Sequence, residues 1–275
     1  MLDFRAGMLA VSLVLAAAGA RAGTPAEPKI GQAGKDVIWI PTPEPVIARM
    51  LAMAQVTGED HVVDLGAGDG RLVIAAAKHY GARATGIEFD AGLVALARRL
   101  ARQQGLSPGR LRMIQGDVFR EDFADATVVG LYLLPEMLLR LRPRLLKLRP
   151  GTRIVSHHFK IPDWEPDEVS WVGVRGAYLW VVPADVAGGW RIAGSDGFAA
   201  DLDVEQSFQR FKGRVQLASV KAGLRATTLR GDAIAFELVD ELGVLRAFSG
   251  RVLGDRIEGS FRAGERAGTW TATRR

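Results

Sequence analysis

A glycine-rich turn at residues 66–70 is the segment of this sequence best suited to binding chemistry. It reads Gly-Ala-Gly-Asp-Gly and follows a short apolar run, 61–65, that contains Asp64. Glycines let a chain bend sharply and let its backbone approach a bound molecule closely. Apolar residues recur at helical spacing from Leu72 onward, so the turn leads into a helix N-terminus, whose free N–H groups suit a carboxylate. The pattern therefore predicts a site for a small molecule that carries a carboxylate.

The spacing of the turn distinguishes between cofactors. Arg71 stands where the dinucleotide fingerprint G-x-G-x-x-G has its third glycine, so a nicotinamide-dependent dehydrogenase is the least favoured reading. S-adenosylmethionine (SAM) carries a carboxylate, an ammonium and a sulfonium, and an acid beside the turn is a natural partner for its cations. Asp64 fits that role. Asp69 is a second candidate, although an exposed loop aspartate is an equally good interpretation of its position.

Two further acids follow the next expected strands. Glu88 ends the run 83–88, and Asp117 comes just after the run 111–115. Taken singly, each acid would more often be a helix cap or a turn residue. Taken together, they follow successive strands beside a glycine turn, at the sheet edge where open α/β sheets bind ligands. Glu88 is expected to accept the ribose hydroxyls and Asp117 the adenine amino group. The predicted cofactor-binding residues are Asp64, Gly66, Gly68, Asp69, Glu88 and Asp117.

Alternating apolar patterns place these residues in a layered fold. Strands are expected at 61–65, 83–88, 111–115, 126–133 and 152–157, most of them separated by helical spacing. This alternation predicts a Rossmann-like, doubly wound and mostly parallel α/β sheet over residues 36–183. The helix that begins at Pro135 is expected to stop or kink before Pro143. Short β-like runs between glycine turns predict a small antiparallel β domain, a barrel or sandwich, over 190–275.

Composition excludes several classes of site. The 275-residue chain has no cysteine, which excludes disulfides, thiolate metal sites and cysteine nucleophiles. Its four histidines show no ligand spacing, so no metal is expected. The net charge of +5 and sequence pI near 9.8 would suit an acidic partner. The charges are scattered rather than clustered, however, so a solvated surface is favoured and no nucleic-acid partner is expected.

The N-terminus has the pattern of a targeting segment. Arg5 precedes an apolar run from Met8 to Ala20, and an A-x-A pattern ends at Ala22. We expect a signal peptide over 1–22, followed by a flexible leader over 23–35. The apolar run is short for a membrane span, but an uncleaved anchor is the alternative. The expected location is therefore periplasmic or membrane-anchored, which conflicts with the cytosolic synthesis of SAM.

The segment Val63–Arg71 resembles motif I of class I SAM-dependent methyltransferases, and the resemblance extends over residues 36–183. The segments Asp36–Pro43 and Arg153–Phe159, the latter followed by Pro162-Asp163-Trp164, resemble the ATP synthase c-subunit lysine methyltransferase family and its bacterial relatives. The resemblance implies N-methylation of a lysine in a protein substrate that is membrane-embedded or small and basic. Residues 190–275 lie outside it.

Methyl transfer to an amine requires alignment and an uncharged nucleophile rather than elaborate acid–base machinery. We expect Thr42, Tyr132 and Ser156 to serve the acceptor, with Trp39 as an aromatic wall of the pocket. A packing role for Tyr132 is an equally good interpretation. A methyltransferase of small molecules or lipids is one alternative function. A binding protein that has kept the fold without activity is another, although its motif residues are intact.

Overall fold

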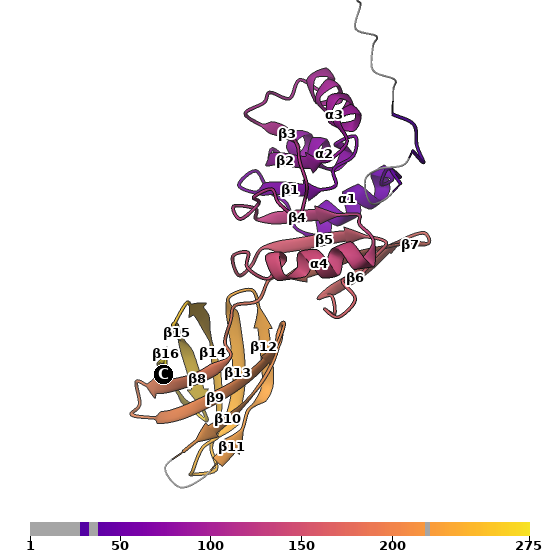
Figure 1. The fold of residues 1–275 in the computed structure, drawn as a ribbon. Coiled ribbons are helices and arrows are strands. Elements are labelled where there is room, and N and C mark those ends of the chain that lie inside the picture. The colour runs from indigo at the N-terminus through magenta and orange to yellow at the C-terminus, as the bar shows by residue number, and fades with distance from the viewer. Residues whose placement is uncertain (1–27, 33–37, 218–220) are drawn as a thin grey trace, which may run out of the picture.

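The computed structural model describes residues 28–32, 38–217 and 221–275, and it contains two β-sheets that follow one another along the chain (Figure 1). The signal peptide and most of the leader expected from the sequence lie outside these residues. No helix in the described part of the chain is long and apolar enough to cross a membrane.

The first sheet has seven strands in the order β3-β2-β1-β4-β5-β7-β6. The first five strands are parallel, and β7 and β6 are antiparallel additions at one edge. The strands are β1 (His61–Leu65), β2 (Arg83–Glu88), β3 (Leu111–Gln115), β4 (Val128–Leu131), β5 (Arg153–His157), β6 (Glu168–Val172) and β7 (Arg175–Val181).

Four helices cover this sheet: α1 (Glu44–Met53), α2 (Arg71–Tyr80), α3 (Ala91–Gln103) and α4 (Pro135–Leu145). Helices α1, α2 and α3 share one apolar core with Val62 and its neighbours on one face of the sheet. On the opposite face of the sheet, helix α4 packs into a second apolar core that contains Val63. Because both faces are covered, β1 and β4 are buried at every position, as continuous apolar strands require.

The structure confirms the Rossmann-like sheet and corrects one detail of it. Helix α4 does not stop before Pro143 but continues to Leu145. Pro143 lies in the last turn of the helix. Proline has no N–H to donate to the carbonyl four residues earlier, but the helix has only two residues left to form after it. The leucines of α4 stay buried through this turn, so packing on the sheet maintains the helix.

The second sheet is antiparallel and nearly closes into a barrel. Its order is β11-β10-β9-β8-β16-β15-β14-β13-β12, and the Thr227 hydroxyl of the edge strand β12 donates to the Phe211 carbonyl of β10, the neighbour of the other edge strand, at 2.9 Å. Its strands are β8 (Gly188–Gly194), β9 (Ala199–Ser207), β10 (Arg210–Gln216), β11 (Lys221–Gly223), β12 (Arg225–Arg230), β13 (Ala233–Val239), β14 (Leu245–Leu253), β15 (Arg256–Ala263) and β16 (Arg266–Arg274). Of the barrel and sandwich alternatives, the barrel is therefore the observed one.

Aromatic side chains fill the barrel. The Phe236 ring stacks on Phe248 at 5.0 Å, and both contact Trp270 edge-on at 5.5 and 5.2 Å. A Cβ on Gly259 would lie 1.9 Å from the Ser249 carbonyl oxygen, so β14 and β15 approach closely at a place where only glycine fits. The barrel thus has its own packed core, separate from those of the first sheet.

A compact contact joins the barrel to the first domain. The Phe208 ring stacks on Trp164 with centroids 5.5 Å apart, and the Trp164 indole N–H donates to Gln209 Oε1 at 2.8 Å. The Ala184 amide donates to the Gly231 carbonyl at 2.8 Å. Trp164 belongs to the core under α4, so the barrel contacts the first domain through that buried side chain.

Candidate active site

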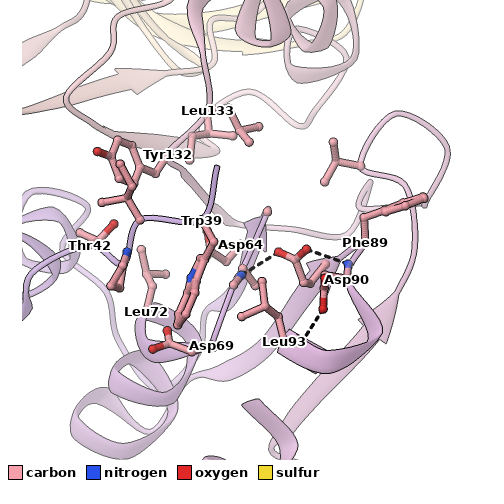
Figure 2. A pocket seen from close by; sticks show the side chains of 18 of the residues that line it. Trp39, Thr42, Asp64, Asp69, Leu72, Phe89, Asp90, Leu93, Tyr132 and Leu133 are labelled. Atoms are coloured by element: carbon pink, nitrogen blue, oxygen red, sulfur yellow. Dashed lines mark hydrogen bonds between the residues drawn. The ribbon is translucent and has the colours of Figure 1, made fainter. Parts of the chain in front are cut away.

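A cavity of about 300 Å³ lies at the carboxyl ends of β1 to β4 (Figure 2). The structure brings most of the predicted site residues together in its lining. Those from the cofactor set are Asp64, Gly66, Gly68, Asp69, Glu88 and Asp117, and those from the acceptor set are Thr42 and Tyr132. Among the residues that the structure describes, none of those lining the cavity comes from the barrel. The active-site candidate therefore belongs to the first domain alone.

The glycine turn adopts backbone angles that other residues rarely adopt. Gly66, Gly68 and Gly70 have φ values of 83°, 56° and 77°. A Cβ on Gly68 would lie 2.7 Å from Trp39 Nε1, because the indole packs directly over the turn. A Cβ on Gly70 would lie 2.9 Å from the Ala97 side chain. The glycines therefore provide both the bend and the close packing of α3 and Trp39 around it.

Asp64 is the most perturbed acid of the cavity. It is the penultimate residue of β1 and is 7% exposed, and no hydrogen bond or ion pair to its carboxylate is present among the described residues. Burial, with the nearby negative charges of Glu88 and Asp69, raises the pKa of Asp64 to about 7. A buried carboxylate without a partner is expensive to ionise, so this position suits a bound cation.

Glu88 organises the opposite wall. One carboxylate oxygen accepts a hydrogen bond from the Gly68 amide and the other from the Asp90 amide, both at 2.9 Å (Figure 2). Asp90 in turn caps α3 by accepting from the Leu93 amide at 2.9 Å. Glu88 therefore ties the end of β2 to the glycine turn. Phe89, half exposed at the rim of the cavity, presents an aromatic face beside it.

Asp117 and Asp69 differ from Asp64 in having local partners. Asp117 Oδ1 accepts from the Phe119 amide at 2.9 Å in the turn after β3. Asp69 pairs with Arg71 through contacts of 2.6 to 3.1 Å, and Arg71 Nη1 also donates to the Thr42 carbonyl at 3.1 Å. The Asp69 charge is thus balanced within the protein, whereas that of Asp64 is not.

The acceptor side of the cavity is aromatic and uncharged. The Tyr132 ring lies 4.1 Å from His157 and 6.2 Å from Phe159, measured between ring centroids. Thr42 Oγ1 lies 3.2 Å from His157 Nδ1. Burial, with electrostatic repulsion from His158 and Arg175, lowers the pKa of His157 to about 4, so its imidazole is neutral near pH 7. This wall can hold an uncharged nucleophile without repelling it.

The structure does not bring Ser156 into the cavity. Ser156 pairs with Tyr178 in the sheet and faces the core under α4, while the adjacent His157 faces the α1 side. The buried Ser156 hydroxyl donates to the Phe159 carbonyl at 2.7 Å and therefore shapes the turn after β5. Its predicted role toward the acceptor is not supported by this placement.

The sequence patterns did not predict three residues of the site: Arg71 and Phe89, which line the cavity, and His157, which contacts the lining residues Thr42 and Tyr132. From the sequence, His157 is considered only as a metal ligand, and Arg71 stands out only as a departure from a glycine fingerprint. For Phe89 a usable signal exists, because it is an aromatic residue directly after a strand-end acid. No group of three or more His, Cys, Asp or Glu side chains able to hold a metal occurs within the described residues.

The residues of the cavity fit SAM. The unpartnered Asp64 carboxylate suits its cationic groups, and the turn packed at the start of α2 offers N–H groups to its carboxylate. Glu88 and Asp117 line the same cavity beside the exposed ring of Phe89, where polar ribose and adenine groups require acceptors. The order of the strands predicts this grouping, and the cavity shows it.

Comparisons with known proteins agree with this site. The model of the ANTKMT methyltransferase domain matches residues 64–168. A protein-lysine N-methyltransferase of Saccharolobus islandicus is 43% identical over 48% of this chain and 83% of its own length. The mouse ATP synthase c-subunit lysine N-methyltransferase is 34% identical, over 47% of this chain and 52% of its own length. The chain thus spans about half the length of the mouse enzyme.

A solved structure adds the cofactor. An RNA methyltransferase from Salinibacter ruber, in complex with S-adenosyl-L-homocysteine, is 45% identical, with a TM-score of 0.52 over 54% of this chain and 96% of its own. These comparisons confirm the predicted resemblance and SAM as the cofactor. Because the archaeal relative is matched over most of its length, the chain belongs to the same family and is a SAM-dependent methyltransferase.

Proposed function

We propose that this methyltransferase transfers the methyl group to the side-chain amine of a lysine in a protein substrate. The charge of the cavity carries the proposal. Its lining contains five acids, Asp64, Asp69, Glu88, Asp90 and Asp117, while Arg71 is the one basic residue of the lining within the described chain. Arg71 is already paired with Asp69. Such a site attracts a cationic lysine and repels the phosphates of a nucleic acid.

The rim of the cavity supports the same choice of acceptor. Ile38, Ile40, Phe89 and Leu134 line the cavity and are between 39% and 57% exposed. A nucleic-acid-binding rim would instead present lysine and arginine side chains to the phosphate backbone. An apolar rim suits a polypeptide segment, as the names of the archaeal and mouse relatives also suggest.

The residues of the acceptor wall prepare an amine for attack. Bound SAM would supply a methyl group on a positively charged sulfur; the amine lone pair would form the new N–C bond as the S–C bond breaks, and the sulfur would leave as a neutral thioether. Partial burial beside Tyr132 and the neutral His157 disfavours a protonated lysine and so favours the free amine. The Tyr132 face can also stabilise the methylated ammonium that results, by about 0.5–2 kcal/mol.

Labelled SAM tests the proposal. The full-length chain is incubated with SAM carrying a radioactive methyl group and with separated protein, RNA and lipid fractions of a bacterial lysate. We expect label in protein, recovered as methylated lysine after acid hydrolysis. Asp64→Ala should abolish labelling, whereas Glu265→Gln, a change at an exposed barrel acid, should leave it intact. Label removed by ribonuclease, or extracted with lipid, would contradict lysine as the acceptor.

A membrane location is a second proposal, and it rests on the sequence of residues 1–22. We propose that this segment takes the chain to the membrane, either as a cleaved signal peptide that exports it or as an uncleaved anchor. N-terminal sequencing of the chain purified from its host separates the two. A mature terminus near Gly23 indicates export, and an intact Met1 in the membrane fraction indicates an anchor. An intact Met1 in the soluble cytosolic fraction would contradict both.

A further inference from the structure

His157 contacts two residues of the acceptor wall from behind. It is the last residue of β5 and is 2% exposed. Its Nδ1 lies 3.2 Å from Thr42 Oγ1, and its ring lies 4.1 Å from the Tyr132 ring at an angle of 44°. Thr42 and Tyr132 line the cavity, whereas His157 does not. The imidazole is therefore placed to act on the site through these two neighbours.

The second nitrogen of His157 makes packing alone a poor explanation for this residue. Nε2 is buried and has no hydrogen-bond partner among the described residues. A buried polar atom without a partner lowers stability, and an aromatic or aliphatic residue of similar size would avoid that cost. The contact that Nδ1 makes with Thr42 is the one that offsets this cost.

The unpartnered nitrogen also indicates where the proton of the neutral imidazole lies. A buried N–H without a partner is rarer in protein interiors than a buried acceptor without one. The proton therefore belongs on Nδ1, which donates to Thr42 Oγ1, and Nε2 keeps its lone pair. This tautomer leaves the second lone pair and the proton of the Thr42 hydroxyl available on the cavity side.

Thr42 is thus fixed at two points from distant parts of the chain. Its carbonyl accepts from Arg71, which the glycine turn positions through Asp69, and its hydroxyl lies 3.2 Å from His157 Nδ1 at the end of β5. Removing the imidazole would leave the backbone of Thr42 in place but free its hydroxyl to rotate. It would also remove the surface against which the Tyr132 ring packs.

We propose that His157 is a positioning residue for methyl transfer, which presets the Thr42 hydroxyl through Nδ1–H and the Tyr132 ring through its face. The inference rests on methyl transfer in this cavity and not on lysine as the acceptor. His157 acts through its neighbours and does not touch the reacting atoms.

A double-mutant cycle tests the coupling. His157→Phe keeps the ring but removes the donor, and Thr42→Val keeps the shape but removes the hydroxyl. Each change should lower kcat about tenfold, the equivalent of one hydrogen bond, and the double variant should be no worse than either single one. His157→Asn, which can place a donor near the position of Nδ1, should recover most of the loss. The affinity for SAM, measured by calorimetry, should change less than twofold in all four.

An exposed histidine away from the cavity provides the matched control. His79→Asn should leave kcat unchanged, because His79 is exposed in the last turn of α2 and does not line the cavity. The proposal would be overturned if the kcat losses of His157→Phe and Thr42→Val multiplied in the double variant. It would also be overturned if both His157→Phe and His157→Asn lost activity because they bind SAM more weakly or melt at a lower temperature.

NMR spectroscopy tests the inference without any methyl acceptor. In ¹⁵N-histidine NMR spectra, His157 should show protonated Nδ1 and unprotonated Nε2, and Thr42→Val should shift its signals while leaving those of His79 in place. The opposite tautomer, or signals indifferent to Thr42, would refute the inference. If label enters RNA or lipid instead of protein, the proposed acceptor fails, but the cycle and the NMR result can still hold.

Discussion

Replacing Asp64 by asparagine should make the protein without SAM less sensitive to pH and more stable at neutral pH. Asp64 is 7% exposed, and burial together with Glu88 and Asp69 raises its pKa from 3.8 to about 7. Asparagine has nearly the same shape but never ionises. The substitution therefore removes the ionisation and little else.

The pKa shift sets the size and the direction of the effect. Below pH ~4 both the folded and the unfolded chain carry the Asp64 proton, so this group makes no difference to stability. Between pH ~4 and ~7 the unfolded chain loses the proton while the folded chain keeps it, so the free energy of unfolding falls as pH rises. Above pH ~7 the loss is complete, and three pKa units correspond to about 4 kcal/mol.

Urea unfolding of the wild type and of Asp64→Asn at several pH values measures this difference. The two curves should diverge from pH ~4 to ~7, with the variant gaining up to about 4 kcal/mol relative to the wild type. A buried amide without a partner costs about 1–3 kcal/mol, but equally at every pH, so the slope is the test rather than the offset. Asp255→Asn, at an acid whose side chain is 84% exposed, is the control.

Binding of SAM should respond in the opposite sense. A deprotonated Asp64 can pair with a cationic group, and charge-assisted contacts contribute about 1.5–3 kcal/mol, so Asp64→Asn should weaken SAM roughly ten- to a hundredfold above pH 7. Near pH 6.5, calorimetry in buffers of different ionisation enthalpy should detect protons released when the wild type binds SAM. Parallel stability curves, together with binding that releases no proton, would refute the reasoning about Asp64.

Three further predictions test other parts of the structure. Glu88→Ala should weaken SAM binding by about 1–3 kcal/mol in calorimetry, because it leaves the amides of Gly68 and Asp90 without their acceptor; unchanged affinity would mean that the ribose lies elsewhere. Gly68→Ala should displace Trp39 and weaken SAM binding at least tenfold, whereas Gly105→Ala, also at positive φ but in open space, should not affect binding. Phe208→Ala should lower the free energy of unfolding by about 1–3 kcal/mol, because it removes a ring stacked on Trp164; a melting curve identical to the wild type would show that this contact does not join the domains.

Local patterns were enough to predict the core of the fold and most of the cofactor site. The alternation of strands and helices, the glycine turn and the strand-end acids are each readable within a few residues. Parallel strands bring their carboxyl ends to one edge of a sheet, so the order of these patterns already implied that Asp64, Glu88 and Asp117 share a cavity. The antiparallel character of the C-terminal part was equally local, since it follows from short strands between glycine turns.

Tertiary structure alone decided which members of the predicted set have partners and which face the cavity. Ser156 and His157 are neighbours on one strand, and the two-residue period of a strand sends one to each face of the sheet. Asp69 and Asp64 are both acids beside the turn, yet only Asp69 meets Arg71. The contact of Thr42 with His157 joins residues 115 positions apart. Such contacts depend on how covered sheets and loops pack in space, and no local pattern in the sequence encodes that packing.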